Sequence, residues 1–318
     1  MAEDTIFSIH EAILSNLERL SNEESTLGEL KAYELYDIAM AMSELTAELS
    51  ADGLDVYEIL SLLSESLDYE SASVSSDTSG IFARLAEKDS LASQRKDRAV
   101  LTELYLDLCK KHAHPLTEPD FLPSHGTDET FTYVRNSFSD EAYDVFSQDF
   151  FDPKVRYSPT FKDAARAVAS GDVTYCLLPL EEKGGVRLHT VAELIFRNDF
   201  RINSVIPVFG QDGNADLKYA LVSKSFTVPK RDPDDDMYLE IRLGMNSDSL
   251  LAEVFGAVDY FGMSIYRVNT VTFDTEGERE TYFSVVIKGE DRDFSPILTY
   301  MALFVRDFVP VGIYKNLE

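Results

Sequence analysis

The sequence predicts an α+β chain of three parts: an all-helical module over residues 1–114, a single α/β lobe over residues 115–230 and a βαββαβ plait over residues 237–318. Three observations support this class. Apolar residues recur at three- and four-residue steps in the first part, which is typical of amphipathic helices. In the second part a near-continuous apolar run follows a helical pattern, as in parallel α/β sheets. In the third part the hydrophobic period alternates between that of strands and that of helices.

Four helical patterns fill the first part of the chain. They cover Ile6 to Leu20, Leu27 to Leu49, Leu54 to Leu67 and Ile81 to Lys111. Five serines within residues 71–80 predict a linker between the third and fourth helices. Residues 1–80 hold 18 acidic and two basic residues. The simplest interpretation is a solvated acidic surface, and the alternative is a docking face for a basic partner.

Strand and helix patterns alternate in the second part. Val155 to Tyr157 predicts a short strand, and Thr160 to Ser170 predicts a helix that ends at Gly171. Val173 to Leu178 predicts a strand buried on both faces, and Val191 to Phe196 predicts the start of another helix. Strand, helix and strand in this order indicate a parallel α/β sheet.

The third part follows an acidic linker, Arg231 to Asp236. Its strand patterns cover Tyr238 to Leu243, Ser264 to Phe273, Glu280 to Ile287 and Val309 to Tyr314. Its helix patterns cover Asp248 to Phe261 and Pro296 to Phe304. This βαββαβ order is that of a ferredoxin-like plait.

Charge and composition exclude several functions. The 318 residues include 57 acidic and 29 basic ones, which gives a formal net charge of −28. Such a charge is repelled by phosphate backbones and by anionic lipid, so we expect no nucleic-acid partner and no membrane partner. No apolar run approaches the ~20 residues that span a bilayer. Two cysteines, and an acidic N-terminus without a signal-peptide pattern, predict a cytoplasmic protein.

Metal and cofactor sites are not expected from the sequence. Residues 212–216 resemble the start of a calcium loop without completing its pattern. His112 and His114 have no third ligand nearby in the sequence. Cys109 lies in a helical pattern and Cys176 in an apolar strand, so we expect both to be core residues rather than nucleophiles.

Several motifs taken in order carry a family resemblance. They are Gly-Thr-Asp-Glu-Thr-Phe-Thr at 126–132, Ser-Pro-Thr-Phe at 158–161, and the stretch from Gly171 to Glu181, in which a buried strand runs into Pro-Leu-Glu. This order resembles the first lobe of prephenate dehydratase, which implies a lobe of the periplasmic-binding-protein-like type that opens with a loop at 126–132. The plait resembles the ACT domain that usually follows this enzyme, with its last strand at 308–314. The resemblance covers roughly residues 121–318.

The resemblance implies a reaction that expels water and carbon dioxide from prephenate to give phenylpyruvate. A positioned acid helps the ring hydroxyl to leave, and donors and cations hold the two carboxylates of the substrate. By matching motifs, the resemblance assigns a ligand site in the lobe to six residues. These are Thr130, Thr132, Glu182, Lys183, Lys218 and Tyr219.

Three departures from the family pattern indicate that the catalytic motif is lost. Lys218, Tyr219 and Ala220 stand where the family has Thr-Arg-Phe, so the hydroxyl donor and the guanidinium fork are missing. Glu182 takes the place of an Asn, and its added negative charge would repel a dianionic substrate. Residues 210–214 form a connection too short to be the family's second lobe.

The ACT-like part also departs from the phenylalanine-binding pattern. Asp248-Ser-Leu250 stands in place of Gly-Ala-Leu, and Asn269-Thr-Val-Thr272 stands in place of Glu-Ser-Arg-Pro. The positions that the resemblance assigns to an ACT ligand are Asn246, Asp248, Leu250 and Asn269. It also implies a homodimer formed through this domain.

Three functional hypotheses follow. The leading one is a catalytically degenerate relative of prephenate dehydratase that senses a small anionic metabolite or an amino acid, or regulates a partner, in phenylalanine biosynthesis. The first alternative is an active dehydratase in which Tyr219 or Glu182 supplies the proton. The second is a structural or assembly protein that binds a partner through its acidic helices. An enzyme requires a closed pocket with converging donors and cations, whereas a sensor requires only a pocket.

Overall fold

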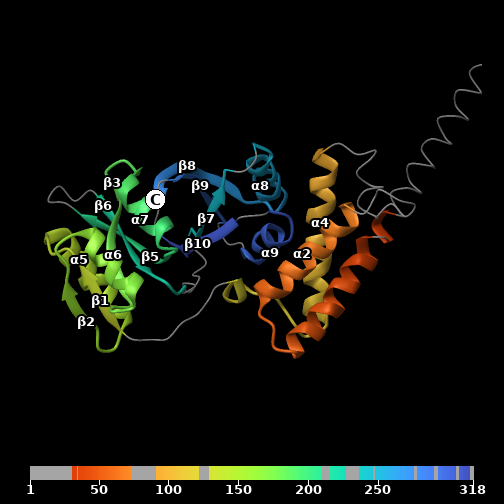
Figure 1. Cartoon of the computed structure of the whole chain (residues 1–318), viewed down its shortest axis with the longest axis horizontal. Coiled ribbons are helices and arrows are strands. Elements are labelled where there is room, and N and C mark those ends of the chain that lie inside the picture. Colours follow the sequence, from red (N-terminus) through yellow and green to blue (C-terminus); the bar gives the residue numbers. More distant parts are fainter. Residues whose placement is uncertain are drawn as a thin grey trace, which may run out of the picture. The chain divides into compact units, whose positions relative to one another are not determined.

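The computed structural model describes residues 31–33, 35–72, 91–121, 129–209, 215–226, 236–245, 248–275, 278–289, 293–305 and 308–315. The chain divides into two compact units, whose elements are labelled in Figure 1. Unit 1 contains Met1–Leu54 and Glu65–Pro115, and unit 2 contains Asp55–Ser64 and Leu116–Glu318. The predicted helix at 6–20, and most of the two predicted linkers at 71–80 and 231–236, lie outside the described residues.

The described residues of unit 1 are mainly helical. A helix covers residues 35–51, and α4 (Leu91–Lys111) provides a second one. The helix α2 (Val56–Ala72) begins in unit 2 and ends in unit 1. The core of unit 1 includes a hydrogen bond of 2.7 Å between the hydroxyls of Thr46 and Tyr105, which satisfies two buried polar groups at once.

Unit 2 is built on a ten-stranded mixed sheet with the strand order β2-β1-β3-β6-β5-β10-β7-β9-β8, and β4 pairs with β3 alone. The first strands of the lobe, β1, β2 and β3, are parallel, and β2 and β3 lie where the sequence predicts strands of a parallel sheet. β6 runs antiparallel to both β3 and β5. The lobe strands are β1 (Thr130–Tyr133), β2 (Lys154–Tyr157), β3 (Tyr175–Glu182), β4 (Val186–Arg187), β5 (Arg201–Phe209) and β6 (Ala215–Ser223).

Three α-helices cover the two faces of the lobe. α6 (Phe161–Ser170) and α7 (His189–Arg197) contribute to one core, and α5 (Ser137–Phe146) contributes to the other. α6 begins at a Thr160 cap and ends at Gly171, whose φ of +82° favours glycine. Two 3₁₀ turns, η1 (Glu118–Phe121) and η2 (Ser147–Asp149), complete the connections.

The structure corrects the sequence reading around residue 130. The loop expected at 126–132 is a strand from Thr130 onward, because Thr and aromatic residues alternate there and pack on both faces of the sheet. The helix α5 has no counterpart in the sequence prediction. Its signal is a capping box, in which Asn136 accepts from the Ser139 backbone and Ser139 accepts from the Asn136 backbone.

The plait elements predicted from residue 238 onward are all observed. They are β7 (Tyr238–Gly244), α8 (Asp248–Tyr260), β8 (Ser264–Thr275), β9 (Glu278–Lys288), α9 (Ser295–Phe304) and β10 (Phe308–Tyr314). Their strands pair antiparallel in the order β10-β7-β9-β8. α9 is almost entirely buried, with the side chains of Ile297, Leu298 and Met301 fully enclosed.

Lobe and plait share one sheet rather than forming two. β10 pairs parallel with β5, and Gly312 lies opposite Ile202. A Cβ atom at position 312 would stand 2.7 Å from the Ile202 carbonyl oxygen, so the approach of the two strands requires glycine. One core spans both parts, because Phe196 and Ile202 of the lobe and Val271 and Tyr314 of the plait belong to it.

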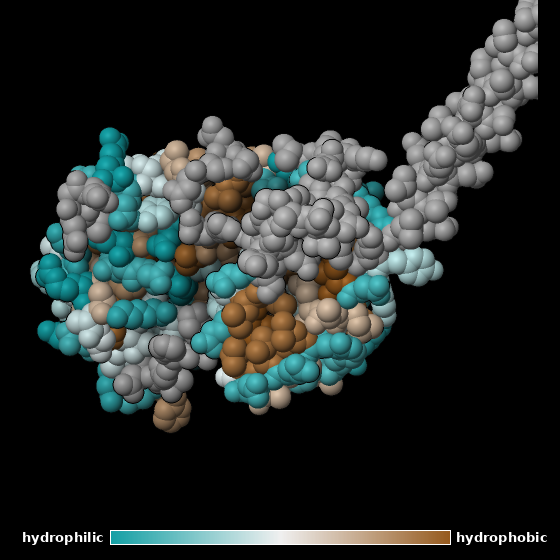
Figure 2. Space-filling view, turned by 45° about the vertical axis from the view of Figure 1, so that its right-hand side comes forward, coloured by the Kyte–Doolittle hydropathy of each residue, from teal (hydrophilic) through white to brown (hydrophobic). Residues whose placement is uncertain are grey.

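Hydrophilic and apolar residues both reach the described surface. Figure 2 shows a face on which hydrophilic residues border a hydrophobic patch. The most exposed large apolar side chain among the described residues is Phe151, at 97%. Within the described part of the chain, no helix combines the length and apolar character needed to cross a membrane.

Candidate functional site

The two threonines predicted in the lobe site lie on β1, where neighbouring residues satisfy their hydroxyls. The Thr132 side chain is fully buried, and its hydroxyl lies 2.7 Å from that of Ser158. The Thr130 hydroxyl accepts a hydrogen bond of 2.9 Å from the backbone of Thr174. Both threonine hydroxyls therefore connect β1 to the segments that follow β2 and precede β3.

The other four predicted residues lie near the far end of β3 and on β6. Glu182 and Lys183 are exposed at the turn between β3 and β4, and Lys218 lies opposite Glu181. Thr132 lies opposite Cys176 on β3, so about six residues, or ~20 Å of strand, separate it from Glu182. The structure thus places Lys218 near Glu182 and Lys183 but does not bring the threonines to them.

Tyr219, the sixth predicted residue, lies in the core. It is 2% exposed and packs with Phe131, Leu177 and Leu221. Burial raises the pKa of its hydroxyl, and a hydrogen bond with the Asn136 side chain partly offsets that rise. A phenol in this position does not reach solvent, although its neighbour Lys218 partly does.

A buried ion-pair cluster occupies the end of β3, and sequence analysis did not identify it. Glu181 is fully buried and pairs with Arg267, while Arg187 Nη1 lies 3.6 Å and Lys218 Nζ 3.9 Å from its carboxylate. Three cations from β4, β6 and β8 therefore surround one carboxylate.

Glu240 forms the other half of this Glu181–Glu240 cluster. Arg187 Nη2 donates to both of its oxygens, at 2.7 and 2.6 Å. Ser284 and Tyr314 donate their hydroxyls to the same carboxylate, at 2.8 and 2.6 Å. The two carboxylates raise the pKa of Arg187 despite its burial, so it stays charged. Burial and the nearby Glu240 charge raise the pKa of the Tyr314 hydroxyl, which keeps its proton to donate.

The cluster joins lobe and plait through their charges. Arg187 comes from the lobe hairpin and Glu240 from the first plait strand, and the two are 53 residues apart in sequence. A buried charge is stable only when partners compensate for its desolvation, which these residues do for one another. The sequence does carry a signal, because Glu240 stands between the apolar residues Leu239 and Ile241, but only the register of the strands reveals its partner.

The four positions assigned to an ACT ligand lie in different parts of the plait or outside the described residues. Asn246 lies outside the described residues, Asp248 is the first residue of α8, and Leu250 is half-buried in that helix. Asn269 lies opposite Ser284 on β8, and its side-chain nitrogen is buried without a hydrogen-bond partner. Their assignment to a ligand stays a prediction.

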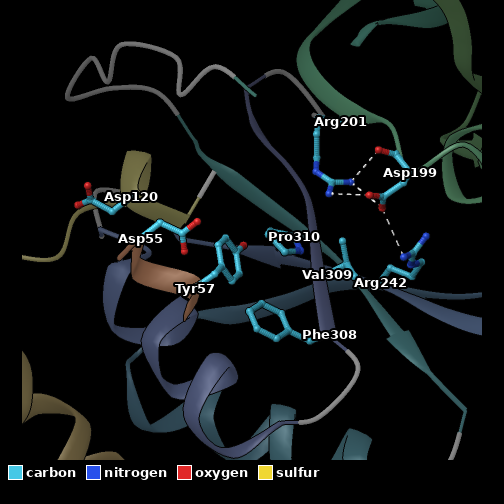
Figure 3. Close-up of a pocket in the computed structure, with 9 residues that line it drawn as sticks. All are labelled: Asp55, Tyr57, Asp120, Asp199, Arg201, Arg242, Phe308, Val309 and Pro310. Carbon is cyan, nitrogen blue, oxygen red and sulfur yellow. Dashed lines mark hydrogen bonds and ion pairs between the residues drawn. The ribbon is translucent and has the colours of Figure 1, made fainter. Parts of the chain in front are cut away.

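A cavity of about 370 Å³ opens elsewhere in unit 2, and we call it the Arg201 pocket (Figure 3). Six elements or connections contribute to it: the start of α2, η1, the turn after α7, the start of β5, and the strands β7 and β10. Its lining residues are Asp55, Tyr57, Asp120, Asp199, Arg201, Arg242, Phe308, Val309 and Pro310. Sequence analysis named none of these as site residues.

Asp199 organises the charged side of the Arg201 pocket. It follows the C-terminus of α7 with a φ of +51°, a conformation that glycine usually supplies at this place and that Asp tolerates. Its carboxylate accepts from both terminal nitrogens of Arg201, at 3.0 and 3.1 Å, and lies 3.4 Å from Arg242 Nη2. Burial acts against the charge, but the two guanidinium groups hold the pKa of Asp199 below its usual range.

Arg201 and Tyr57 border the same cavity. Arg201 is 8% exposed, and its Nε is buried without a hydrogen-bond partner. Burial raises the pKa of the Tyr57 hydroxyl, while the Arg201 charge lowers it and the charges of Asp199 and Asp55 raise it. The phenol therefore stays protonated and lines the same cavity as Arg201, whose Nε has no hydrogen-bond partner.

A second, wider cavity of about 640 Å³ adjoins the first through Arg242 and Val309. It is lined mostly by β7, β9 and the start of β10. Arg242 separates the two cavities: its Nη1 donates to the Phe196 carbonyl at 2.7 Å, and its guanidinium lies over the Tyr282 ring at 5.1 Å. This double anchor fixes the guanidinium in place.

The described part of the chain contains neither a cluster of potential metal ligands nor a reactive cysteine. No group of three or more potential metal ligands occurs among the residues that the structure describes. Cys109 and Cys176 are both buried, and burial raises the pKa of their thiols to about 11 and about 12. Neither thiol forms an appreciable thiolate near neutral pH.

Comparisons with known proteins give structural similarities only. No protein-family model and no curated protein sequence matches this chain. A prephenate dehydratase from Streptococcus mutans is similar over 59% of this chain and 98% of its own, with 13% identity and a TM-score of 0.44. One from Arthrobacter aurescens, in complex with L-Phe, is similar over 59% and 90%, with 13% identity and a TM-score of 0.44.

A further similar structure is GqqA, described as a novel type of quorum-quenching acylase. It covers 60% of this chain and 96% of its own, with 19% identity and a TM-score of 0.43. At TM-scores this low, these similarities carry no argument about the fold or the activity of this chain.

Proposed function

We propose that this chain is a catalytically degenerate relative of prephenate dehydratase that senses a small molecule, or regulates a partner, in aromatic amino-acid biosynthesis. One observation carries the proposal. Lys218, which takes the place of a family threonine in the resemblance, has a side chain only 15% exposed and faces Glu181. That fully buried carboxylate also pairs with Arg267 and lies near Arg187. A substrate carboxylate would have to displace an internal one.

The alternative of an active dehydratase needs an acid that reaches the substrate. Tyr219 is enclosed in the core and hydrogen-bonded through Asn136, which argues against it as the proton donor. Glu182 is exposed, at the start of a turn that Gly184 and Gly185 form with positive φ. An exposed carboxylate at a turn is not held in a closed site with converging donors and cations, which the enzyme hypothesis requires.

The proposal is tested by prephenate turnover. The purified full-length chain is incubated with prephenate at high protein concentration, and phenylpyruvate is followed beside the Streptococcus mutans dehydratase. We expect no phenylpyruvate above the uncatalysed rate. Turnover that is lost in Lys218→Ala or Tyr219→Phe would overturn the proposal, because it would reveal a rebuilt active site.

A second experiment asks whether the β3 to β4 turn still borders an anion site. Glu182→Ala removes an exposed negative charge next to Lys183. If this turn lines a site, the affinity for prephenate, measured by calorimetry, should rise. An unchanged affinity would show that this turn is not part of the site and would leave the Arg201 pocket as the candidate.

We also propose that the protein forms a homodimer through its plait. The support is that β8, a strand of 12 residues, ends the order of the described sheet and offers an unpaired edge. Pairing with a second copy would cover that edge. Light scattering coupled to gel filtration should give twice the chain mass, and Val268→Pro, in the middle of β8, should return a monomer.

A further inference from the structure

We propose that the Arg201 pocket binds a free α-amino acid, with the ligand carboxylate at Arg201 and the ligand ammonium at Asp55. The inference rests on the proposed sensing function and names its ligand class and site. Nothing in the family resemblance points to this pocket, because none of the ten residues predicted to bind ligands lines it. The argument comes from the charges, the apolar wall and the size of the cavity.

The cationic side of the pocket has a donor available for a carboxylate. Asp199 occupies Nη1 and Nη2 of Arg201, and the buried Nε has no partner. A buried donor without a partner costs free energy, and an anionic acceptor would remove that cost. The Tyr57 phenol, which stays protonated and lies beside Asp55 in Figure 3, is a second donor that lines the cavity.

The anionic side is provided by Asp55. Its Oδ1 accepts from the Glu58 backbone at 2.9 Å and thereby caps α2, which fixes the carboxylate in place. In Figure 3, Asp55 lies beside Tyr57, whereas the Asp120 carboxylate points away from Arg201. Asp120 is also engaged by the backbone and the hydroxyl of Thr117, both at 2.7 Å. Asp55 is therefore the better partner for an ammonium group.

An apolar wall and the volume complete the match. Phe308, Val309 and Pro310 line the pocket from β10 and present carbon surface to the side chain of a ligand. About 370 Å³ lies at the small end of the roughly 300–1,000 Å³ that ligand pockets span. A single amino acid fits this description, whereas a larger metabolite such as a nucleotide does not.

Opposite charges on two sides select a zwitterion over a singly charged molecule. A plain carboxylate would leave Asp55 without a cation and would bring a second negative charge near Asp199. A plain amine would leave Arg201 Nε without its acceptor. Only a ligand that carries both groups satisfies both sides, and the unpaired group in either alternative costs affinity.

The test uses matched ligands on the full chain. L-Leucine, 3-methylbutylamine and 4-methylpentanoate share one carbon skeleton and differ in their charged groups, and L-phenylalanine, 2-phenylethylamine and 3-phenylpropanoate form a larger set. Affinities are measured by calorimetry, and thermal stabilisation is measured for all twenty amino acids. We expect at least one amino acid to bind, and each of its single-charge analogues to bind at least about ten-fold more weakly.

Three variants locate the site. Asp55→Asn keeps a good helix cap and removes only the charge, so it should abolish the preference for the amino acid over its deaminated analogue. Arg201→Gln should lower the affinity for the amino acid and the affinity for its carboxylate analogue equally, by about ten-fold or more. Arg166→Gln removes an arginine from an exposed pair with Asp163 and should leave both affinities unchanged.

The outcomes separate this inference from the proposed function. If none of the twenty amino acids binds, or if single-charge analogues bind as tightly, the inference is overturned. It is also overturned if Asp55→Asn and Arg201→Gln behave like Arg166→Gln. Binding of prephenate or another anion without turnover would then leave the sensing function standing. Conversion of prephenate to phenylpyruvate would remove the sensing function whatever the amino acids do.

Discussion

Two ionic clusters lie on the same face of the sheet and differ in what their charges can do. Glu240 of the first cluster and Arg242 of the second are two residues apart on β7, so their side chains leave the strand on one side. Glu240 is enclosed and receives three different donors. Arg242 lines two cavities and meets an Asp199 carboxylate that is 60% exposed.

The two clusters differ in whether the chain itself pairs all of their charged groups or leaves one for a ligand. In the Glu181–Glu240 cluster the partners come from the chain itself, and burial makes each of them necessary. In the Arg201 pocket the chain satisfies one edge of a guanidinium and leaves another donor without a partner. In this molecule, charged residues thus indicate a ligand site only where a polar group without a hydrogen-bond partner borders a cavity.

The largest expected effect comes from breaking the buried cluster. Glu240→Gln keeps the shape of the side chain but leaves Arg187 as a buried cation with one carboxylate fewer, which should lower the free energy of unfolding by about 3–5 kcal/mol. Urea denaturation measures it. The control is Glu193→Gln, which removes a half-exposed i,i+4 pair with Arg197 and should cost about 0.3–0.5 kcal/mol. Equal losses in the two variants would refute a structural role for the buried charge.

The next effect comes from separating β10 from β5, the two strands at which lobe and plait meet. Gly312→Ala would place a Cβ 2.7 Å from the Ile202 carbonyl oxygen, and we expect a loss of about 1–3 kcal/mol. Amide exchange in both strands should accelerate. Gly184→Ala is the control, because Gly184 has a positive φ but open space around it, so it strains only its own turn. Unchanged exchange at β5 would contradict the proposed joint.

A smaller and pH-dependent effect is expected at Asp199. Its pKa is lower in the folded chain, so the stability it contributes is present above the usual aspartate pKa of about 3.9 and is lost as the pH falls below that value. Asp199→Asn keeps a residue that tolerates positive φ and should cost at most about 1 kcal/mol at pH 7, because the group is exposed.

The measurement for Asp199 is the difference in unfolding free energy between the parent and the variant at pH 7, 5 and 3. The difference should stay constant from pH 7 to pH 5 and shrink at pH 3. A difference that grew on acidification would show that the folded state raises this pKa, which would contradict the pairing with Arg201 and Arg242.

The smallest effect is expected at an exposed ion pair, which serves as the reference for the other variants. Arg166 and Asp163 form a pair on the surface of α6 at 2.8 Å, with the arginine side chain 66% exposed. Solvent and salt screen such pairs. Arg166→Gln should leave the midpoint of thermal unfolding within experimental error. A clear shift would mean that exposed pairs contribute more here than the comparison of the two clusters assumes.

The sequence predicted most elements because periodicity and caps are local. The strand at 154–157, the helix that Gly171 ends, and the βαββαβ order of the plait all follow from side chains within a few residues of each other. The errors at β1 and α5 were also local. Both elements carry a local signal, which is the alternation of Thr with aromatic residues in β1 and the capping box at Asn136 in α5.

The candidate sites depend on contacts that no local pattern contains. Arg187 meets Glu240 across 53 residues, and Arg267 meets Glu181 across 86. The Arg201 pocket joins residues from position 55 to position 310. The resemblance directed attention to Lys218 and Tyr219, yet burial assigns one to an internal ion pair and the other to the core.

The sequence by itself determined the acidic charge, the helices over residues 35–72 and 91–111, the strands and helices predicted between residues 155 and 196, and the βαββαβ order from residue 238 onward. These properties depend on composition and on hydrophobic period, which neighbouring residues fix. The tertiary structure alone decided that lobe and plait share one sheet at Gly312, which carboxylates are enclosed, and which arginine keeps a donor beside a cavity. The physical reason is that strand register and burial set which distant charges meet and whether water or a ligand can reach them.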